Sequence, residues 1–298
     1  MENNHTHGHN HCHDSVKNIK LAFFLNLFFT IIEFIGGILT NSVAIMSDAL
    51  HDLGDSFSLG FAWFLEKYSN KKRNNKFSYG FKRFSLLGAF INATILLIGS
   101  LFILTEAIPR IIHPEPSNAY GMILLSIFGI LVNGFAVYKT TNGKSMNEKV
   151  ISLHLLEDVL GWIAVLVISI VMIFTDLIIL DPILSMLITL YILWGVIKNL
   201  KQTVLLFLQA SPENLDVNTI DNTLKKQDYI KEIHDTHIWS LDGESNIMTT
   251  HIVINEKSSI KEIKNIKIKT REILEKIGIK HSTIEIDFGD EKCKNHCD

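Results

Sequence analysis

Long apolar stretches separated by short polar connections fill the first two thirds of this 298-residue chain. Crossing about 30 Å of hydrocarbon takes roughly 20 helical residues. Six stretches reach that length, at residues 18–40, 43–65, 84–108, 119–139, 150–174 and 177–198. The pattern predicts an all-α, six-helix transmembrane domain over residues 18–208, preceded by a polar tail at residues 1–17.

Beyond residue 208 the apolar stretches become short and alternate with polar residues. This second pattern predicts, in order, a helix at 214–227, strands at 230–241 and 247–255, a helix at 259–277 and a strand at 281–288. The order αββαβ indicates a small α+β domain of ferredoxin-like type at 209–290, with its helices on one face of the sheet. Residues 291–298 remain as a tail that contains cysteine and histidine.

Basic residues gather on one side of the predicted spans. The connection between spans two and three contains Lys67, Lys71, Lys72, Arg73, Lys76, Lys82 and Arg83, and further lysines follow spans four and six. The other side offers little more than Arg110. Because Lys and Arg concentrate in cytoplasmic loops, both termini and the α+β domain are expected in the cytosol.

Overall composition narrows the class of protein. A net charge of −3 gives no dominant basic surface, which argues against a nucleic-acid partner. Three cysteines cannot build a disulfide framework. A composition rich in Asn, Lys and Ile favours a prokaryotic source, so the cell membrane is the expected location, with a eukaryotic organelle as the second choice.

Two of the predicted spans carry the same pair of ionisable residues. Span two contains His51 and Asp55, and span five contains His154 and Asp158. Residues four apart share one face of a helix, so two facing helices can present two imidazoles and two carboxylates, a set that suits tetrahedral Zn²⁺. Two carboxylates balance one divalent cation, and an empty site should take up protons instead. The pattern therefore predicts metal transport in exchange for protons.

Other interpretations of the polar groups inside the spans stay open. Each His–Asp pair can be a structural hydrogen bond within the bundle. Asp48 is expected beside the site or at its mouth, whereas Asp52 and Glu157 have no assigned role. Asn26, Glu33, Asn92 and Glu106 either line the ion path or make hydrogen bonds between helices, which is the more frequent case.

Both tails are rich in metal-ligating side chains. The N-terminal one contains His5, His7, His9, His11, Cys12 and His13, and the C-terminal one contains Cys293, His296 and Cys297. Alternating histidines are typical of metal-gathering segments. The competing interpretations are an expression tag for the first tail and incidental ligands for the second.

The motifs themselves resemble a known family. SDALHDLGD and LHLLED in the spans, KFSYGFKRFSLLGAFIN after the basic loop, and IHDTHIWSL and HSTIEI near the end are similar to the cation diffusion facilitators. The resemblance implies a homodimer with six transmembrane helices and a cytosolic αββαβ domain. It also implies export of Zn²⁺, with Cd²⁺ and Co²⁺ as further cargoes, against protons through His51, Asp55, His154 and Asp158. Histidine at the first of these positions is similar to zinc-preferring members.

The resemblance extends to metal ligands in the α+β domain. Residues of the family that match His234, His251 and the acidic last strand, with Glu285 and Asp287 here, bind zinc at the dimer interface. Relatives carry histidine where this chain has Glu285, and they often carry an acid where it has Gln209. His237 either joins these ligands or packs and hydrogen-bonds within the sheet.

Three rival functions can be weighed against transport. A membrane metalloenzyme would need an open coordination position and a general base, and the HExxH arrangement is absent from the sequence. A channel needs weak, multiple sites rather than a four-ligand cage. A membrane zinc sensor that does not transport remains the alternative. Because the metalloenzyme is disfavoured, no enzymatic activity is expected.

Overall fold

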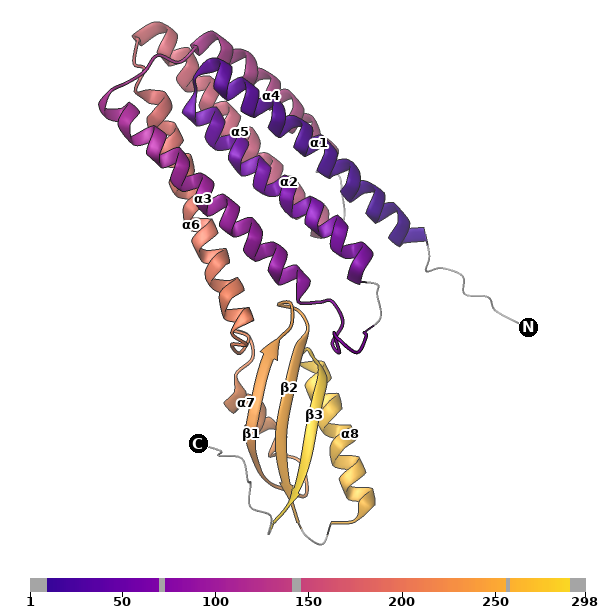
Figure 1. Ribbon diagram of the computed structural model, residues 1–298. Coiled ribbons are helices and arrows are strands. Elements are labelled where there is room, and N and C mark those ends of the chain that lie inside the picture. Colours follow the sequence, from indigo (N-terminus) through magenta and orange to yellow (C-terminus); the bar gives the residue numbers. More distant parts are fainter. Residues whose placement is uncertain (1–9, 70–72, 141–145, 256–257, 290–298) are drawn as a thin grey trace, which may run out of the picture. The chain divides into compact units, whose positions relative to one another are not determined.

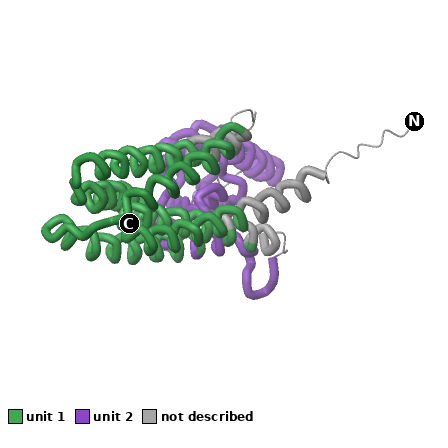
Figure 2. The backbone as a smooth tube through the Cα atoms, turned by 90° about the horizontal axis from the view of Figure 1, so that it is seen from above, with its two compact units in different colours: residues 1–71, 88–200 green, residues 72–87, 201–298 purple. Residues whose placement is uncertain are grey.

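The computed structural model describes residues 10–69, 73–140, 146–255 and 258–289 (Figure 1). The chain divides into two compact units (Figure 2). The first, here the helical unit, comprises Met1–Lys71 and Gly88–Leu200, and the second, here the sheet unit, comprises Lys72–Leu87 and Lys201–Asp298. Residues 72–87 thus group with the sheet unit, although the sequence places 72–83 in a loop between spans and 84–87 in the third span.

Six long helices occupy the predicted spans. They are α1 (Asn10–Thr40), α2 (Val43–Ser69), α3 (Phe84–Ile112), α4 (Ala119–Thr140), α5 (Met146–Thr175) and α6 (Leu180–Phe207). Five of the six are long and apolar enough to cross a membrane, and the exception is α2, which contains Asp48, Asp52 and Asp55. A sixth span through α2 stays a prediction. Helix α1 begins at Asn10, so His11, Cys12 and His13 belong to it rather than to a separate tail.

The helical unit has its main apolar core among α1, α2, α4 and α5. Trp162 of α5 packs there with Phe29 of α1 and Met122 of α4. A Cβ added at Gly129 of α4 would lie 2.4 Å from the Trp162 ring, so this glycine lets α4 and α5 approach closely. Helices α3 and α6 pack together through Ala93, Ile192 and Val196.

Large apolar side chains also cover the outer faces of these helices. Phe28, Leu131 and Phe174 are exposed by 65 %, 66 % and 82 %. In water such a surface would favour aggregation, whereas hydrocarbon solvates it well. The helical unit therefore has the surface of a protein surrounded by lipid.

A buried carboxylate joins the first turns of α2 and α6. Asp181 of α6 is only 2 % exposed. It accepts hydrogen bonds from the Ser42 hydroxyl (2.6 Å) and from the backbone N–H groups of Val43 (2.9 Å) and Ala44 (3.4 Å). The first N–H groups of a helix have no partner within it, and a negative charge there is stabilised by the helix dipole. Asp181 thus acts as an N-terminal cap for a helix that lies far from it in the sequence.

The sheet unit contains the αββαβ order expected from the sequence. Its elements are α7 (Val217–Leu224), β1 (Ile230–Ser240), β2 (Asn246–Ile254), α8 (Ile260–Lys276) and β3 (Ile279–Phe288). The strand order is β1-β2-β3, with β1 antiparallel and β3 parallel to β2. Both helices begin at a side-chain cap, Asp216 for α7 and the Ser259–Glu262 capping box for α8.

One apolar core unites the sheet with both helices. Ile220 and Leu224 of α7 and Ile266 and Leu274 of α8 pack against inward residues of the three strands. The helices therefore share one face of the sheet, as the sequence predicts, and the other face is left for polar side chains. A ferredoxin-like relationship stays a prediction.

Strand β1 contains a bulge that changes which of its residues face the apolar core and which face the polar side of the sheet. His234 pairs with His251 and His237 pairs with Thr249, so three residue steps of β1 lie opposite two of β2. Asp235 has a φ of 52°, in the left-handed region that Asp tolerates better than most residues. The extra residue lets Ile233 and Ile238 both face the core.

The Asp181 cap yields a test of stability. We expect Asp181→Asn to destabilise the protein by about 1–3 kcal/mol, because an amide removes the charge and directs N–H groups at the donors of α2. The readout is the melting temperature of the full chain in detergent. The matched control is Asp176→Asn, a change at an exposed position just before α6. Equal melting temperatures for the two variants would contradict the role of the cap.

Candidate metal centres

The first candidate centre lies within the helical unit. His51 Nε2 and Asp55 Oδ2 of α2 are 3.6 Å apart, one helical turn from each other. His154 and Asp158 have the same spacing on α5, although the side chain of His154 lies outside the described part of the chain. An imidazole and a carboxylate at this separation can bind one cation between them.

One pocket of ≈ 290 Å³ joins the two helices that carry these pairs. His51 of α2 and Asp158 of α5 both line it, together with Asp48, Glu157 and apolar residues of α6. A Cβ added at Gly161 would lie 3.6 Å from Asp48 Oδ1, so α2 and α5 are close at this level. The structure thus brings members of both pairs to one cavity. Asp48 lines it as the sequence predicts, and so does Glu157, which had no assigned role.

Glu33 of α1 is more deeply buried than its sequence context suggested. It is 1 % exposed, and its carboxyl group lies close enough to that of Asp52 for the two to share a hydrogen bond when one of them is protonated. Its charged neighbours are Asp52 and Asp48 of α2 and Asp158 of α5. The signal in the sequence was the presence of an acid within an apolar span, but the spacing could not show that this acid faces α2.

Two other polar residues of the spans contact neighbouring residues, one on another helix and one on its own helix. Asn26 donates from Nδ2 to the carbonyl of Asp52 and to Ser56 Oγ, both at 3.0 Å. This is the helix-to-helix hydrogen bond that was the more frequent expectation. Glu106 lies 3.9 Å from Arg110 of its own helix and is not among the residues that line the pocket.

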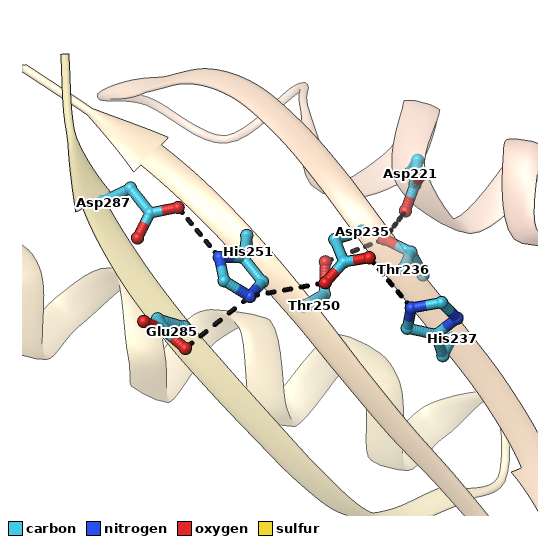
Figure 3. Close-up of polar contacts among 8 residues, drawn as sticks. All are labelled: Asp221, Asp235, Thr236, His237, Thr250, His251, Glu285 and Asp287. Carbon is cyan, nitrogen blue, oxygen red and sulfur yellow. Dashed lines mark hydrogen bonds and ion pairs between the residues drawn. The ribbon is translucent and has the colours of Figure 1, made fainter. Parts of the chain in front are cut away.

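The second candidate centre lies on the polar face of the sheet. His234 of β1, His251 of β2 and Asp287 of β3 each offer one ligand atom, and the three atoms lie within 4.8 Å of one another. His251 Nδ1 is 2.9 Å from Asp287 Oδ2, and His234 Nε2 is 3.5 Å from the same oxygen (Figure 3 shows the first contact). The strand register explains the grouping, because His251 is the direct partner of His234.

The other nitrogen of His251 faces different acids (Figure 3). His251 Nε2 lies 3.6 Å from Asp235 Oδ2 and 3.6 Å from Glu285 Oε2. Asp235 also contacts His237 Nε2 at 2.9 Å. Glu285, which the sequence grouped with the other three ligands, therefore lies on the opposite edge of the His251 ring. His237 is hydrogen-bonded within the sheet, as one of its two interpretations predicted.

A chain of hydrogen bonds fixes the bulge from the core side. The Thr236 hydroxyl donates to Asp221 of α7 at 2.9 Å and lies 2.8 Å from the Thr250 hydroxyl (Figure 3). Since a hydroxyl has only one proton to give, Thr250 is the donor to Thr236. Burial raises the pKa of Asp221, against the opposing effects of Thr236 and Lys225. The contacts tie β1 to α7 and β2 beside the histidines.

The remaining predicted ligands cannot be placed. Residues 1–9 and 290–298 lie outside the described part, and so do the side chains of His11, Cys12 and His13. The metal-gathering role of His5, His7, His9, His11, Cys12, His13, Cys293 and Cys297 stays a prediction.

Comparisons with known proteins address the family. Residues 19–208 match the model of the cation efflux transmembrane domain, and residues 212–288 match that of the cation efflux protein, cytoplasmic domain. The chain belongs to the cation diffusion facilitator family. Members of this family are metal transporters of the membrane rather than enzymes. The match to the second domain coincides with the three-stranded α+β fold of the sheet unit.

Individual members of the cation diffusion facilitator family align along nearly the whole chain. The "Cadmium, cobalt and zinc/H(+)-K(+) antiporter" of Bacillus velezensis is 36 % identical, over 94 % of this chain and 91 % of the relative. The "Zinc transporter ZitB" of Pectobacterium atrosepticum is 31 % identical, over 97 % and 91 %. The "Metal cation efflux system protein CzcD" of Cupriavidus metallidurans is 28 % identical, over 95 % and 90 %. The family and the names of these relatives support metal cation efflux as the function.

The hydrogen bonds around Asp221 yield a prediction about pH. Because the pKa of Asp221 is raised on folding, ionising this carboxyl costs more free energy in the folded protein than in the unfolded chain. The stability contributed by the neutral form is present at low pH and is lost as the pH rises through the raised pKa. An amide in place of this carboxylate would still accept from Thr236 without a charge. We therefore expect Asp221→Asn to melt at a higher temperature than the native protein at pH 7, with the difference vanishing below about pH 4.

Thermal unfolding followed by circular dichroism across this pH range measures the effect. Asp228→Asn, at an exposed position of the same unit, serves as the control and should show little change at pH 7. A lower melting temperature for Asp221→Asn at pH 7 would contradict the expected cost of the buried charge.

Proposed function

We propose that this protein exports Zn²⁺ from the cytosol in exchange for protons, with Cd²⁺ and Co²⁺ as further cargoes. The transport site is formed by His51, Asp55, His154 and Asp158. The observation that carries the proposal is the pocket shared by His51 of α2 and Asp158 of α5. The names of the relatives support zinc, cadmium and cobalt as cargo.

The charges around this pocket supply the physical basis for exchange. Asp55 and Asp158 bring two negative charges to a helical unit whose outer surface is apolar, and leaving both ionised without a counter-ion costs free energy. A divalent cation neutralises the pair, and so do protons. Metal binding therefore releases protons, and protons arriving from the other side displace the metal. Glu33 and Asp48 add further acids nearby and increase the cost of an empty, ionised site.

The alternative function is a zinc sensor that binds metal in the membrane but does not move it. A sensor needs a metal site that is accessible from one side of the membrane only. A transporter needs the site to open first to one side and then to the other. The two functions share every ligand and differ in flux. A transport assay in vesicles therefore separates them directly.

The polar face of the sheet is proposed as a second, regulatory Zn²⁺ site. His234, His251 and Asp287 provide three ligands, so a tetrahedral ion would have one position left for water or for a group from elsewhere. We further propose a homodimer, in line with the family resemblance. By the positive-inside rule this domain and both termini lie in the cytosol, and the cell membrane is the proposed location.

Reconstitution into proteoliposomes tests the transport site. We expect the native protein to move Zn²⁺ inward against protons, read by a trapped zinc dye and a trapped pH dye. Asp55→Asn and Asp158→Asn should each lower both signals by about tenfold or more, because loss of a metal ligand should cost at least as much as loss of its outer partners. Asp176→Asn is the control with an unchanged pocket.

Two outcomes of this assay count against the proposal. Transport that survives in both aspartate variants would exclude the proposed ligands. Zinc binding without flux in the native protein would favour the sensor. Repeating the assay with and without a K⁺ gradient shows whether K⁺ also takes part, since the Bacillus relative is named for exchange against both H⁺ and K⁺.

Equilibrium zinc binding tests the site on the sheet. In a background of Asp55→Asn and Asp158→Asn, which silences the transport site, His234→Ala and His251→Ala should each lower the number of bound ions by one per chain. His281→Ala removes an exposed histidine of β3 that lies outside the group, and should leave the number unchanged. Equal stoichiometry in all three variants would contradict a site at His234 and His251.

A further inference from the structure

A second kind of cavity, unrelated to metal ligands, lies within the sheet unit. It has a volume of ≈ 340 Å³ and is lined by the loop before α3, by the turn after α6 and by the end of β1. The loop contributes Lys76, Lys82 and Arg83, and the other elements contribute Gln209 and Trp239. Three cationic side chains thus converge on one hollow, and no Asp or Glu is among the described residues that line it.

None of the three cations has a direct ion-pair partner among the residues that the structure describes. The sequence has no acid between Glu66 and Glu106. Lys82 Nζ donates to the Ser245 hydroxyl at 2.7 Å, and this hydroxyl donates to the Asp242 carboxylate at 3.0 Å, so Asp242 reaches Lys82 only through Ser245. Arg83 Nε is shielded from solvent and has no hydrogen-bond partner among the described residues. A guanidinium N–H that is dry and without an acceptor is costly, and an anion in the pocket would remove that cost.

The loop that carries these cations is rigidly built. The side chain of Asn74 accepts from the N–H groups of Lys76 (3.0 Å) and Phe77 (2.8 Å). Gly80, with a φ of 76°, closes a turn back to the carbonyl of Phe77 at 3.0 Å. The Phe77 ring packs against those of Phe81 and Phe84. A loop fixed in this way holds its cations together before a ligand arrives, which lowers the entropy cost of binding.

We propose that this pocket binds a phosphate group, with the headgroup of an anionic phospholipid as its main source. Tetrahedral phosphate oxygens suit the fork of Arg83 and the point charges of the lysines. The first turn of α3 begins in the pocket wall at Phe84 and adds the positive end of a helix dipole. The location of the pocket favours a lipid as the source. Phe84 is the first residue of α3 and Gln209 lies two residues after α6, and both helices are long and apolar enough to span a membrane. Basic pockets at such ends bind anionic headgroups.

Calorimetry on the full-length protein in a neutral detergent tests the proposal with three probes. These are a short-chain phosphatidic acid, inorganic phosphate, and a phosphatidylcholine of the same chain length. We expect saturable binding of phosphatidic acid and at most weak binding of phosphatidylcholine, whose phosphate charge is balanced by choline. Comparable binding of inorganic phosphate would assign the pocket to a soluble phosphate rather than to a lipid, and would still support phosphate recognition.

Variants separate the pocket from general attraction to charge. Lys76→Gln with Arg83→Gln should weaken phosphatidic acid binding by about tenfold or more, as expected for lost charge-assisted hydrogen bonds. Lys264→Gln with Lys269→Gln removes two exposed charges from α8 and should have little effect. Gln209→Glu, nearly isosteric, places a carboxylate among the cations and should also weaken binding.

The melting temperature of each variant shows whether it has folded. No saturable binding of either anionic probe, or an equal loss in the pocket pair and the α8 pair, would overturn the proposal. Unchanged binding in Gln209→Glu would do the same. Because the readout is binding and not flux, the result does not depend on whether the chain transports zinc.

Discussion

The contact between Asp181 and the first turn of α2 sets the position of the helix on which the rest of the helical unit depends. Val43 and Ala44 are buried in the protein, so the free N–H groups of this helix end have no water to bond with and need a partner from the protein. Asp181 supplies it from α6. About two turns further along α2 lie Asp48 and His51, and the neighbouring helices meet there. The cap at one end of α2 thus helps to hold its ionisable groups level with those of α5.

The two candidate centres use the same chemical groups in different surroundings. In the helical unit the acids lie among apolar helices, where an ionised carboxylate without a counter-ion costs free energy. On the sheet, His251 is held between carboxylates of β1 and β3, at a face that has access to water. Under the proposed function, the first environment suits exchange of one cation for another, and the second suits retention of a bound ion. Imidazole and carboxylate alone do not distinguish the two.

Much of this architecture could be predicted from periodicity. The presence and order of the apolar helices and of the three strands follow from hydrophobic runs and alternation, because burial selects apolar residues at regular positions. Their ends do not, since α1 begins at Asn10 and α6 continues to Phe207. Contacts between residues that are distant in the sequence produce no such local pattern. Asp181 reads as a lone acid at the start of a span, Glu33 as one polar residue in another, and the left-handed Asp235 as an ordinary strand residue. The grouping of His234, His251 and Asp287 was expected from family resemblance, whereas the place of Glu285 on the other side of the ring needed the strand register.

The bulge at Asp235 has a consequence for how such a sheet can change over generations. By adding one residue to β1, it lets the strand keep Ile233 and Ile238 in the core while His234 and His237 stay on the opposite face. The inward-facing residues are constrained by packing in the core, whereas the outward-facing ones are constrained only by contacts with their neighbours on the surface. Side chains on that face can therefore change without disturbing the core of the sheet unit. The sheet unit thus keeps the residues that stabilise it apart from the residues of its candidate metal centre.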